Sequence, residues 1–163
     1  MIYDKISIAD DVYLIGKNDD RVVPFHRLML EKGTTYNSYL VEGEKRAVID
    51  TVDISFGKEY VEALSAHTDP AEIDYIVINH VEPDHSGGLP ALASKAKSAV
   101  IVCSAYAEGE LKQMYNLYSR EFLIVGDGDT LDLGGKRLRF IDTPWLHTEE
   151  TMVTFLEEEG ILF

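Results

Sequence analysis

The sequence contains very little cysteine and comparatively little positive charge. Cys103 is the only cysteine in 163 residues, so no disulfide can form within the chain, which favours a reducing, cytoplasmic location. Lysine and arginine number 15 against 29 aspartates and glutamates, which gives a formal net charge of −14. Because so acidic a chain repels phosphate backbones and anionic lipids, we expect neither a nucleic-acid partner nor a membrane partner.

Long apolar runs, a leader sequence, repeats and low-complexity tracts are missing as well. No apolar stretch is long enough for a bilayer-spanning helix. Segment 1–11 lacks the basic region and apolar core of a secretory signal. The apolar fraction of 45% is nevertheless enough for a hydrophobic core, and the length fits one domain. We therefore expect residues 1–163 to form one domain without a linker.

The hydrophobic pattern predicts a strand-rich beginning and then alternating helices and strands. Apolar alternation predicts strands at 5–8, 11–16, 35–42 and 46–51, with a turn at 43–45 between the last two. The remaining predicted elements are helices at 55–69, 87–97 and 105–118, strands at 73–80, 98–104, 121–126, 151–156 and 160–163, and a hairpin at 126–143. This order predicts an α/β domain whose sheet is covered by helices.

The last predicted strand ends at Phe163, inside an apolar run. A strand that ends there would leave its next neighbour missing, and an open hydrophobic edge is an aggregation hazard. We therefore expect either that the sequence is the N-terminal part of a longer protein or that a partner completes the sheet.

The segment NHVEPDHSGG, residues 79–88, gathers four side chains that could bind metal directly after an apolar strand. In extended backbone, residues two apart point to the same side, so His80, Glu82 and Asp84 are predicted to converge. His85 would then face a neighbouring point. Four ligands in so short a loop suit two adjacent ions better than one.

His147 is the natural fifth ligand. It lies in DTPWLHTEETM, between two predicted strands, where Pro144 and Trp145 are expected to stiffen the loop. Histidines with carboxylates suit iron, manganese or zinc, and the carboxylates favour the harder redox metals, but ligand type alone leaves iron and zinc open. The alternative is purely structural: His80 and Asp84 would only cap a helix that begins near Ser86.

The segment H-x-E-x-D-H-S-G, which begins at His80, resembles the metallo-β-lactamase motif His-x-His-x-Asp-His, with Glu82 at the second histidine. That replacement resembles the flavodiiron proteins, also called A-type flavoproteins. Four segments carry the resemblance over nearly the whole chain: 33–41 (GTTYNSYLV), 47–52 (AVIDTV), 79–90 (NHVEPDHSGGLP) and 146–155 (LHTEETMVTF). The resemblance implies a metallo-β-lactamase-like αββα sandwich, of which residues 1–163 would form the N-terminal portion, incomplete at the C-terminus.

The resemblance also implies a non-haem di-iron centre. His80, Glu82 and His147 would bind one iron, and Asp84 and His85 the second, although in some relatives the histidine at the position of His85 is not a ligand. The family's bridging aspartate and final histidine cannot be assigned to any residue of this sequence. Its flavodoxin-like FMN domain is also absent from it.

Full-length relatives reduce dioxygen to water, nitric oxide to nitrous oxide, or both. The resemblance implies electrons delivered by FMN from rubredoxin or another small donor, in a head-to-tail homodimer. A zinc-dependent hydrolase of the metallo-β-lactamase type is the alternative, and Glu82 argues against it. A further alternative is a catalytically incomplete fragment.

Two residues outside the predicted ligand set could assist the metal centre. His26, which matches a family position near the iron pocket, is expected either to hydrogen-bond substrate or to be a partly buried structural histidine. Asp50, at the end of a predicted strand, is expected to orient a ligand histidine through its second ring nitrogen.

Overall fold

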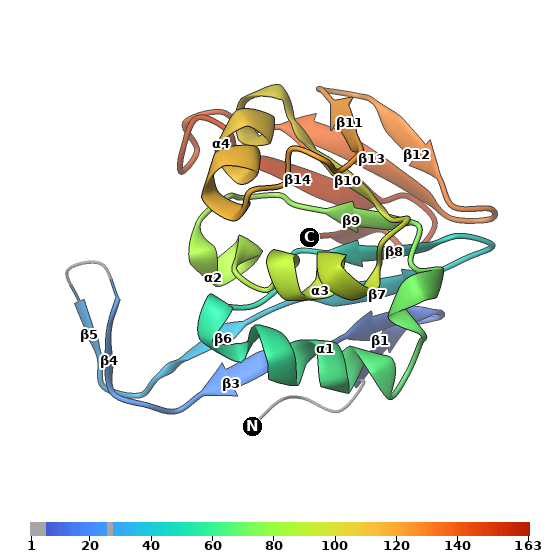
Figure 1. Cartoon of the computed structure of the whole chain (residues 1–163). Coiled ribbons are helices and arrows are strands. Elements are labelled where there is room, and N and C mark those ends of the chain that lie inside the picture. The colour runs from blue at the N-terminus through green and yellow to red at the C-terminus, as the bar shows by residue number, and fades with distance from the viewer. Residues whose placement is uncertain (1–5, 26–27) are drawn as a thin grey trace.

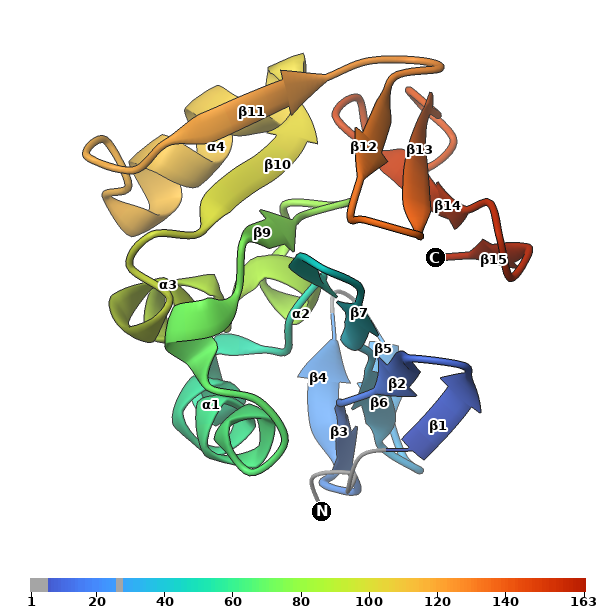
Figure 2. The same cartoon turned by 90° about the vertical axis from the view of Figure 1, so that its right-hand side faces the viewer.

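The structure is a computed structural model that describes residues 6–25 and 28–163. Helices, a large sheet and a second sheet form three successive layers (Figure 2). This is the α/β arrangement predicted from the order of the elements, and it corresponds to three layers of an αββα sandwich. The strand-rich first part and the alternating second part build the same large sheet, as Figure 1 shows.

The large sheet has seven strands. In order across the sheet they are β1 (Ile6–Ala9), β2 (Val12–Leu14), β7 (Tyr39–Glu42), β8 (Arg46–Ile49), β9 (Tyr75–Val77), β10 (Val100–Ser104) and β11 (Phe122–Val125). Strands β1, β2, β7 and β8 pair antiparallel, whereas β8 to β11 pair parallel. The carboxyl ends of the parallel strands therefore lie at one edge of the sheet, where loops can converge.

Helices cover one face of this sheet. They are α1 (Gly57–Ser65), α2 (Pro83–Ser86), α3 (Leu89–Lys95) and α4 (Ala105–Tyr115), with the short 3-10 helices η1 (Ile54–Phe56) and η2 (Pro70–Glu72). The apolar stripe predicted for the first helix is confirmed, because Tyr60, Val61 and Leu64 are buried. No helix in the described part of the chain combines the length and apolar character needed to cross a bilayer.

The other face of the large sheet packs against a four-stranded sheet. Its strands are β12 (Thr130–Asp132), β13 (Arg137–Asp142), β14 (Met152–Leu156) and β15 (Ile161–Leu162). The core between the sheets is apolar and contains Val41, Ile49 and Val77 from one side and Phe140 and Leu156 from the other. Burial of these side chains is what holds the sheets together.

Two short ribbons were predicted incompletely. Strand β3 (Lys17–Asp19), which was not predicted, pairs with β6 (Thr34–Tyr36). The predicted strand 35–42 is therefore split into β6 and β7, and the predicted strand 11–16 is shortened to β2. Strand β4 (Val23–Phe25) pairs with β5 (Leu28–Leu30) in a hairpin that was not predicted and that projects from the body of the molecule (Figure 1). Short strands around Pro24 carry too little alternation to be recognised.

Two helix predictions also need correction. The helix predicted at 55–69 is interrupted: α1 ends at Ser65, and η1 and η2 flank it. The helix predicted at 87–97 is preceded by α2, which occupies part of the predicted ligand loop. Gly87 allows α2 to pack closely against η1, because a Cβ there would lie 2.3 Å from Ile54 N.

Candidate metal centre

The loop after β9 and the loop before β14 are joined by hydrogen bonds at Asn79. The backbone amide of Met152 donates to the Asn79 carbonyl at 3.0 Å. Thr154 Oγ1 donates to Asn79 Oδ1 at 2.7 Å, in a buried contact between the two sheets. These bonds bring together two segments of the chain that lie more than sixty positions apart and that both carry predicted ligands.

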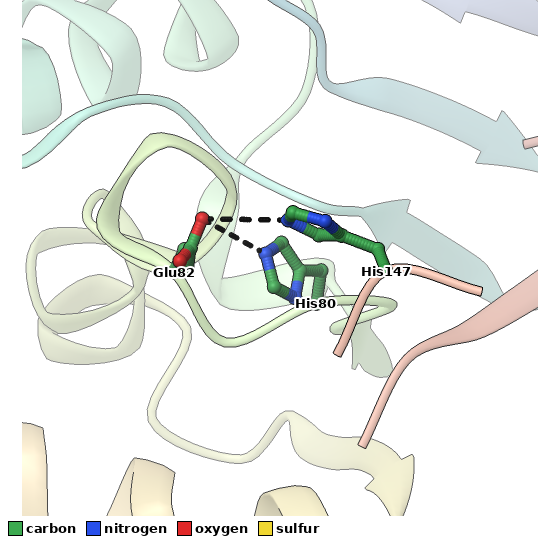
Figure 3. Close-up of side chains that lie close together, drawn as sticks. All are labelled: His80, Glu82 and His147. Atoms are coloured by element: carbon green, nitrogen blue, oxygen red, sulfur yellow. Dashed lines mark ion pairs between the residues drawn. The ribbon is translucent and has the colours of Figure 1, made fainter. Parts of the chain in front are cut away.

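His80, Glu82 and His147 meet where these loops adjoin. Glu82 Oε2 lies 3.2 Å from His80 Nε2 and 3.6 Å from His147 Nε2 (Figure 3). One potential ligand atom from each residue lies within 4.8 Å of the others. Within residues 6–25 and 28–163 this is the one group of at least three such side chains found so close together.

The ring orientation of His80 suits a ligand. Its Nδ1 lies 2.7 Å from Glu150 Oε1, and an ionised carboxylate can only accept, so Nδ1–H is the donor. Nε2 is then left with a lone pair; it is buried and has no hydrogen-bond partner, although Glu82 Oε2 is at ion-pair distance. A buried lone pair facing a carboxylate oxygen is unfavourable without a cation between them, so these residues fit a metal ion.

Glu150 was not predicted. Its Oε1 also accepts from Thr148 Oγ1 at 2.9 Å and from the Val81 amide at 3.3 Å. Burial raises the pKa of the Glu150 carboxyl, but its hydrogen bonds, including those from Thr148 and His80, outweigh burial and lower the pKa overall. The sequence did show an acid close to His147, but it could not indicate which of the neighbours Glu149 and Glu150 would contact a histidine.

Asp84 and His85 are placed differently from the prediction. The extended backbone expected through residues 80–85 is wrong beyond Glu82, because α2 begins at Pro83, whose fixed φ suits the first position of a helix. Asp84 and His85 therefore lie on a helical turn, and neither belongs to the group of three. His85 Nε2 lies 3.7 Å from Asp84 Oδ2, and its ring centroid is 5.1 Å from that of His80.

Asp50 contacts His85, one of the histidines in the predicted ligand set. Asp50 Oδ2 lies 3.1 Å from His85 Nδ1, and Oδ1 accepts the Asn79 amide at 2.7 Å. Burial lowers the pKa of His85, but the hydrogen bond to Asp50 and the charges of Asp50, Asp84 and Glu82 outweigh burial and raise the pKa. The backbone of Asp50 has a φ of 51°, in the left-handed region that few non-glycine residues adopt.

The structural alternative, in which His80 and Asp84 only cap a helix, is wrong. Helix α2 has Glu82 at its N-cap and α3 has Gly88, and neither N-cap makes a side-chain capping bond. His26 lies outside the described residues. His80, His85 and His147 line an open pocket of about 190 Å³. The other residues of its wall are Asp50, Asn79, Thr151, Met152, Val153 and Phe163.

The loop that carries His147 is organised by its backbone. Trp145 has a φ of 64° and donates its amide to the Thr148 carbonyl at 2.9 Å, while Leu146 donates to Thr143 at 3.1 Å. Trp145 is 72% exposed, so any stiffening of the loop by this residue does not come from burial of its side chain. His147 is also more exposed than the other two members of the group.

Comparison with protein families gives a match over most of the chain. Residues 34–163 match the family described as ODP family beta lactamase. An anaerobic nitric oxide reductase flavorubredoxin from Salmonella arizonae is 39% identical over 161 residues, which are 97% of this chain and 34% of the relative. The chain thus spans about a third of the length of this curated relative.

Solved structures agree with this match. The flavodiiron protein from Giardia intestinalis superimposes with a TM-score of 0.94 and 34% identity, over 99% of this chain and 39% of that protein. The rubredoxin oxygen:oxidoreductase from Desulfovibrio gigas gives 0.92 and 34%, over 97% of this chain and 40% of its own. The chain therefore belongs to the ODP family beta lactamases, and its fold is that of the corresponding part of the flavodiiron proteins.

Proposed function

We propose that residues 1–163 are the N-terminal portion of a di-iron domain that serves in the reduction of dioxygen to water, of nitric oxide to nitrous oxide, or of both. The observation that carries the proposal is the buried, unpartnered Nε2 of His80, which faces Glu82 beside His147. The names of two relatives, a nitric oxide reductase and an oxygen oxidoreductase, support the reaction class.

His80, Glu82 and His147 would hold one iron, because their donor atoms already lie close together. Asp84 and His85 would hold the second, since they adjoin the first group and the two histidine rings lie 5.1 Å apart. Histidine with carboxylate is a donor set that iron accepts in both its ferrous and ferric states. Two ferrous ions, when bound, would supply two electrons together to a diatomic substrate.

The chain's own residues have three tasks in this proposal. Glu82 and Asp84 offset cationic charge with carboxylates, which stabilises any bound cation. Asp50 and Glu150 hold the ring nitrogens that face away from the centre. Met152, which forms the pocket wall together with Val153 and Phe163, limits the water that surrounds the centre.

The electrons would come from FMN bound to a flavodoxin-like domain outside residues 1–163. We propose rubredoxin or another small protein as the donor, since one solved relative is a rubredoxin oxygen:oxidoreductase and a curated relative is a flavorubredoxin. A head-to-tail homodimer would bring the FMN of one subunit to the centre of the other. The single cysteine and the acidic composition support a cytoplasmic location without nucleic-acid or membrane partners.

The test is an anaerobic titration of the metal-free chain with Fe²⁺ and, separately, with Zn²⁺. We expect at least one Fe²⁺ per chain, with binding strongly reduced in His80→Ala and His147→Ala. His67→Ala, at an exposed turn just after α1, is the matched histidine control and should bind as the wild type does. Iron binding that ignores His147, or hydrolysis of a thioester or lactam by the zinc-loaded chain, would overturn the proposal.

A further inference from the structure

We infer that Glu150 is a positioning residue, which fixes His80 in the Nδ1–H tautomer and holds the loop of His147 against it. The inference rests on the proposed metal-binding function for its consequence, but its structural content concerns the metal-free protein alone. Glu150 is separate from the predicted ligand set and is buried, with 4% of its surface exposed. It occupies the junction between the two loops that bring the candidate ligands together.

One carboxylate oxygen serves both loops. Glu150 Oε1 accepts from His80 Nδ1 at 2.7 Å and from the Val81 amide at 3.3 Å, which belong to the loop after β9. It also accepts from Thr148 Oγ1 at 2.9 Å, next to His147. Removal of this oxygen would therefore deprive three donors of a shared acceptor, two of them on one ligand loop and one on the other. The hydroxyl of Thr148 would remain 3.2 Å from His80 Nδ1, a longer contact than the 2.7 Å to Glu150.

The backbone of Glu150 is held from a third direction. Ser104 Oγ donates to the Glu150 carbonyl at 2.8 Å, and the same hydroxyl accepts the Ala107 amide at the start of α4 at 3.3 Å. This attachment ties residue 150 to the end of β10. Because both its backbone and its side chain are held, Glu150 can dictate the ring orientation of His80 instead of adapting to it.

The chemical consequence concerns which nitrogen of His80 can bind a cation. With the proton on Nδ1, the lone pair of Nε2 points toward Glu82, 3.2 Å away. The other tautomer would place a proton on Nε2 and exclude a metal. A carboxylate behind Nδ1–H fixes the orientation of a ligand histidine, and loss of such a carboxylate typically costs about 10–100-fold in metal affinity.

The first experiment measures the tautomer directly. In the metal-free chain at about pH 8.5, roughly two units above the ordinary imidazole pKa, ¹⁵N NMR of the histidine rings reports which nitrogen carries the proton. We expect His80 as Nδ1–H in the wild type and in Glu149→Gln. A proton on Nε2 in the wild type would overturn the inference, whatever metal the protein binds.

The second experiment measures Co²⁺ and Fe²⁺ affinity by anaerobic competition with a chelator. Glu150→Gln should lose about 10–100-fold, with a changed Co²⁺ absorption spectrum, and Glu150→Asp should restore part of the loss. Glu149→Gln, an exposed neighbour of the same charge, is the matched control and should leave the affinity unchanged. Equal affinities in Glu150→Gln and wild type would contradict the inference.

Two further comparisons distinguish a failure of the inference from misfolding of the variant and from a failure of the proposed function. Far-ultraviolet circular dichroism of metal-free Glu150→Gln should match the wild type; if that variant does not fold, the wild-type tautomer and Glu150→Asp still decide. Failure of the wild-type chain to bind either metal, with His80 found as Nδ1–H, would overturn the proposed function and leave the positioning role of Glu150 supported.

Discussion

Asp50 Oδ2 lies 3.1 Å from His85 Nδ1, and this pair repeats, on the neighbouring histidine, the contact between Glu150 and His80. Both rings therefore have a carboxylate behind the nitrogen that faces away from the centre. The two pairs differ in solvent access: the His80 side chain is 5% exposed, whereas that of His85 is 42% exposed. The half of the candidate centre that contains His80 is therefore buried, whereas the half that contains His85 is open to solvent.

We predict that metal loads these halves in order, because His80, Glu82 and His147 are already gathered around one point. In a calorimetric titration with Co²⁺, the tighter step should stay within about threefold of wild type in His85→Ala. The same step should weaken at least about tenfold in His147→Ala. Equal weakening of that step in both variants would contradict an ordered loading, and His67→Ala serves as the control.

The buried hydrogen bond between Thr154 and Asn79 should contribute measurably to stability. Thr154→Val keeps the side-chain shape but removes the donor to Asn79 Oδ1, so an unsatisfied acceptor remains between the two sheets. We expect a loss of about 1–3 kcal/mol in urea unfolding of the metal-free chain. Thr130→Val, at an exposed strand position, should change the free energy of unfolding by less than about 0.5 kcal/mol.

Two glycines should respond in opposite directions to alanine. A Cβ at Gly87 would lie 2.3 Å from Ile54 N and 2.4 Å from Pro83 O, so Gly87→Ala should destabilise the metal-free chain by about 2–3 kcal/mol. Gly109, inside α4, has no atom within 4 Å of an added Cβ. Gly109→Ala should therefore stabilise by about 0.5–1 kcal/mol. Thermal unfolding of both variants checks the pair, and similar losses would contradict the close packing of α2 on η1.

Acid should weaken the hydrogen bonds between Arg21 and Asp19, the last residue of β3. Arg21 donates two side-chain hydrogen bonds to the buried Asp19, each of 2.7 Å, and these bonds lower the pKa of Asp19. A lowered folded-state pKa stabilises the fold above the ordinary carboxyl pKa of about 3.9, and this contribution is lost as pH falls through the folded-state value.

Arg21→Gln should therefore be less stable than wild type at neutral pH, and the difference should shrink in that acidic range. Urea unfolding measured at several pH values checks this, with Lys32→Gln as an exposed control of equal charge change. A stability difference that does not depend on pH would show that Arg21 acts by packing alone, since its guanidinium also lies 4.6 Å from the Phe56 ring centre.

Much of the architecture could be predicted because hydrophobic patterns depend on local sequence. Val77 ends a strand whose apolar run was evident, and Glu82 follows it in extended backbone, so the approach of Glu82 to His80 was predictable. The helical turn at Asp84 and His85 was missed although Pro83 signals a helix start. There the metal motif was interpreted as one continuous loop, and the backbone preference of proline was overlooked.

The role of Glu150 could not be predicted from local sequence. Glu149 and Glu150 are chemically identical neighbours, and only the folded structure shows that Glu150 is buried against His80 and Val81 whereas Glu149 is exposed. Likewise, Asp50 combines a left-handed backbone with side-chain bonds to Asn79 and His85, which come from distant positions in the sequence. Long-range contacts of this kind decide which of several similar residues enters a site.

The position of the candidate ligands on separate layers has a mechanical consequence. His80 and Glu82 lie in the loop after β9 of the seven-stranded sheet, whereas His147 lies in the loop between β13 and β14 of the four-stranded sheet. A cation held by all three would therefore cross-link the two sheets at one end. Pulling the layers apart would then require the ion to leave. When the free metal concentration exceeds the dissociation constant, each further tenfold rise in their ratio would add about 1.4 kcal/mol to the free energy needed to separate the layers.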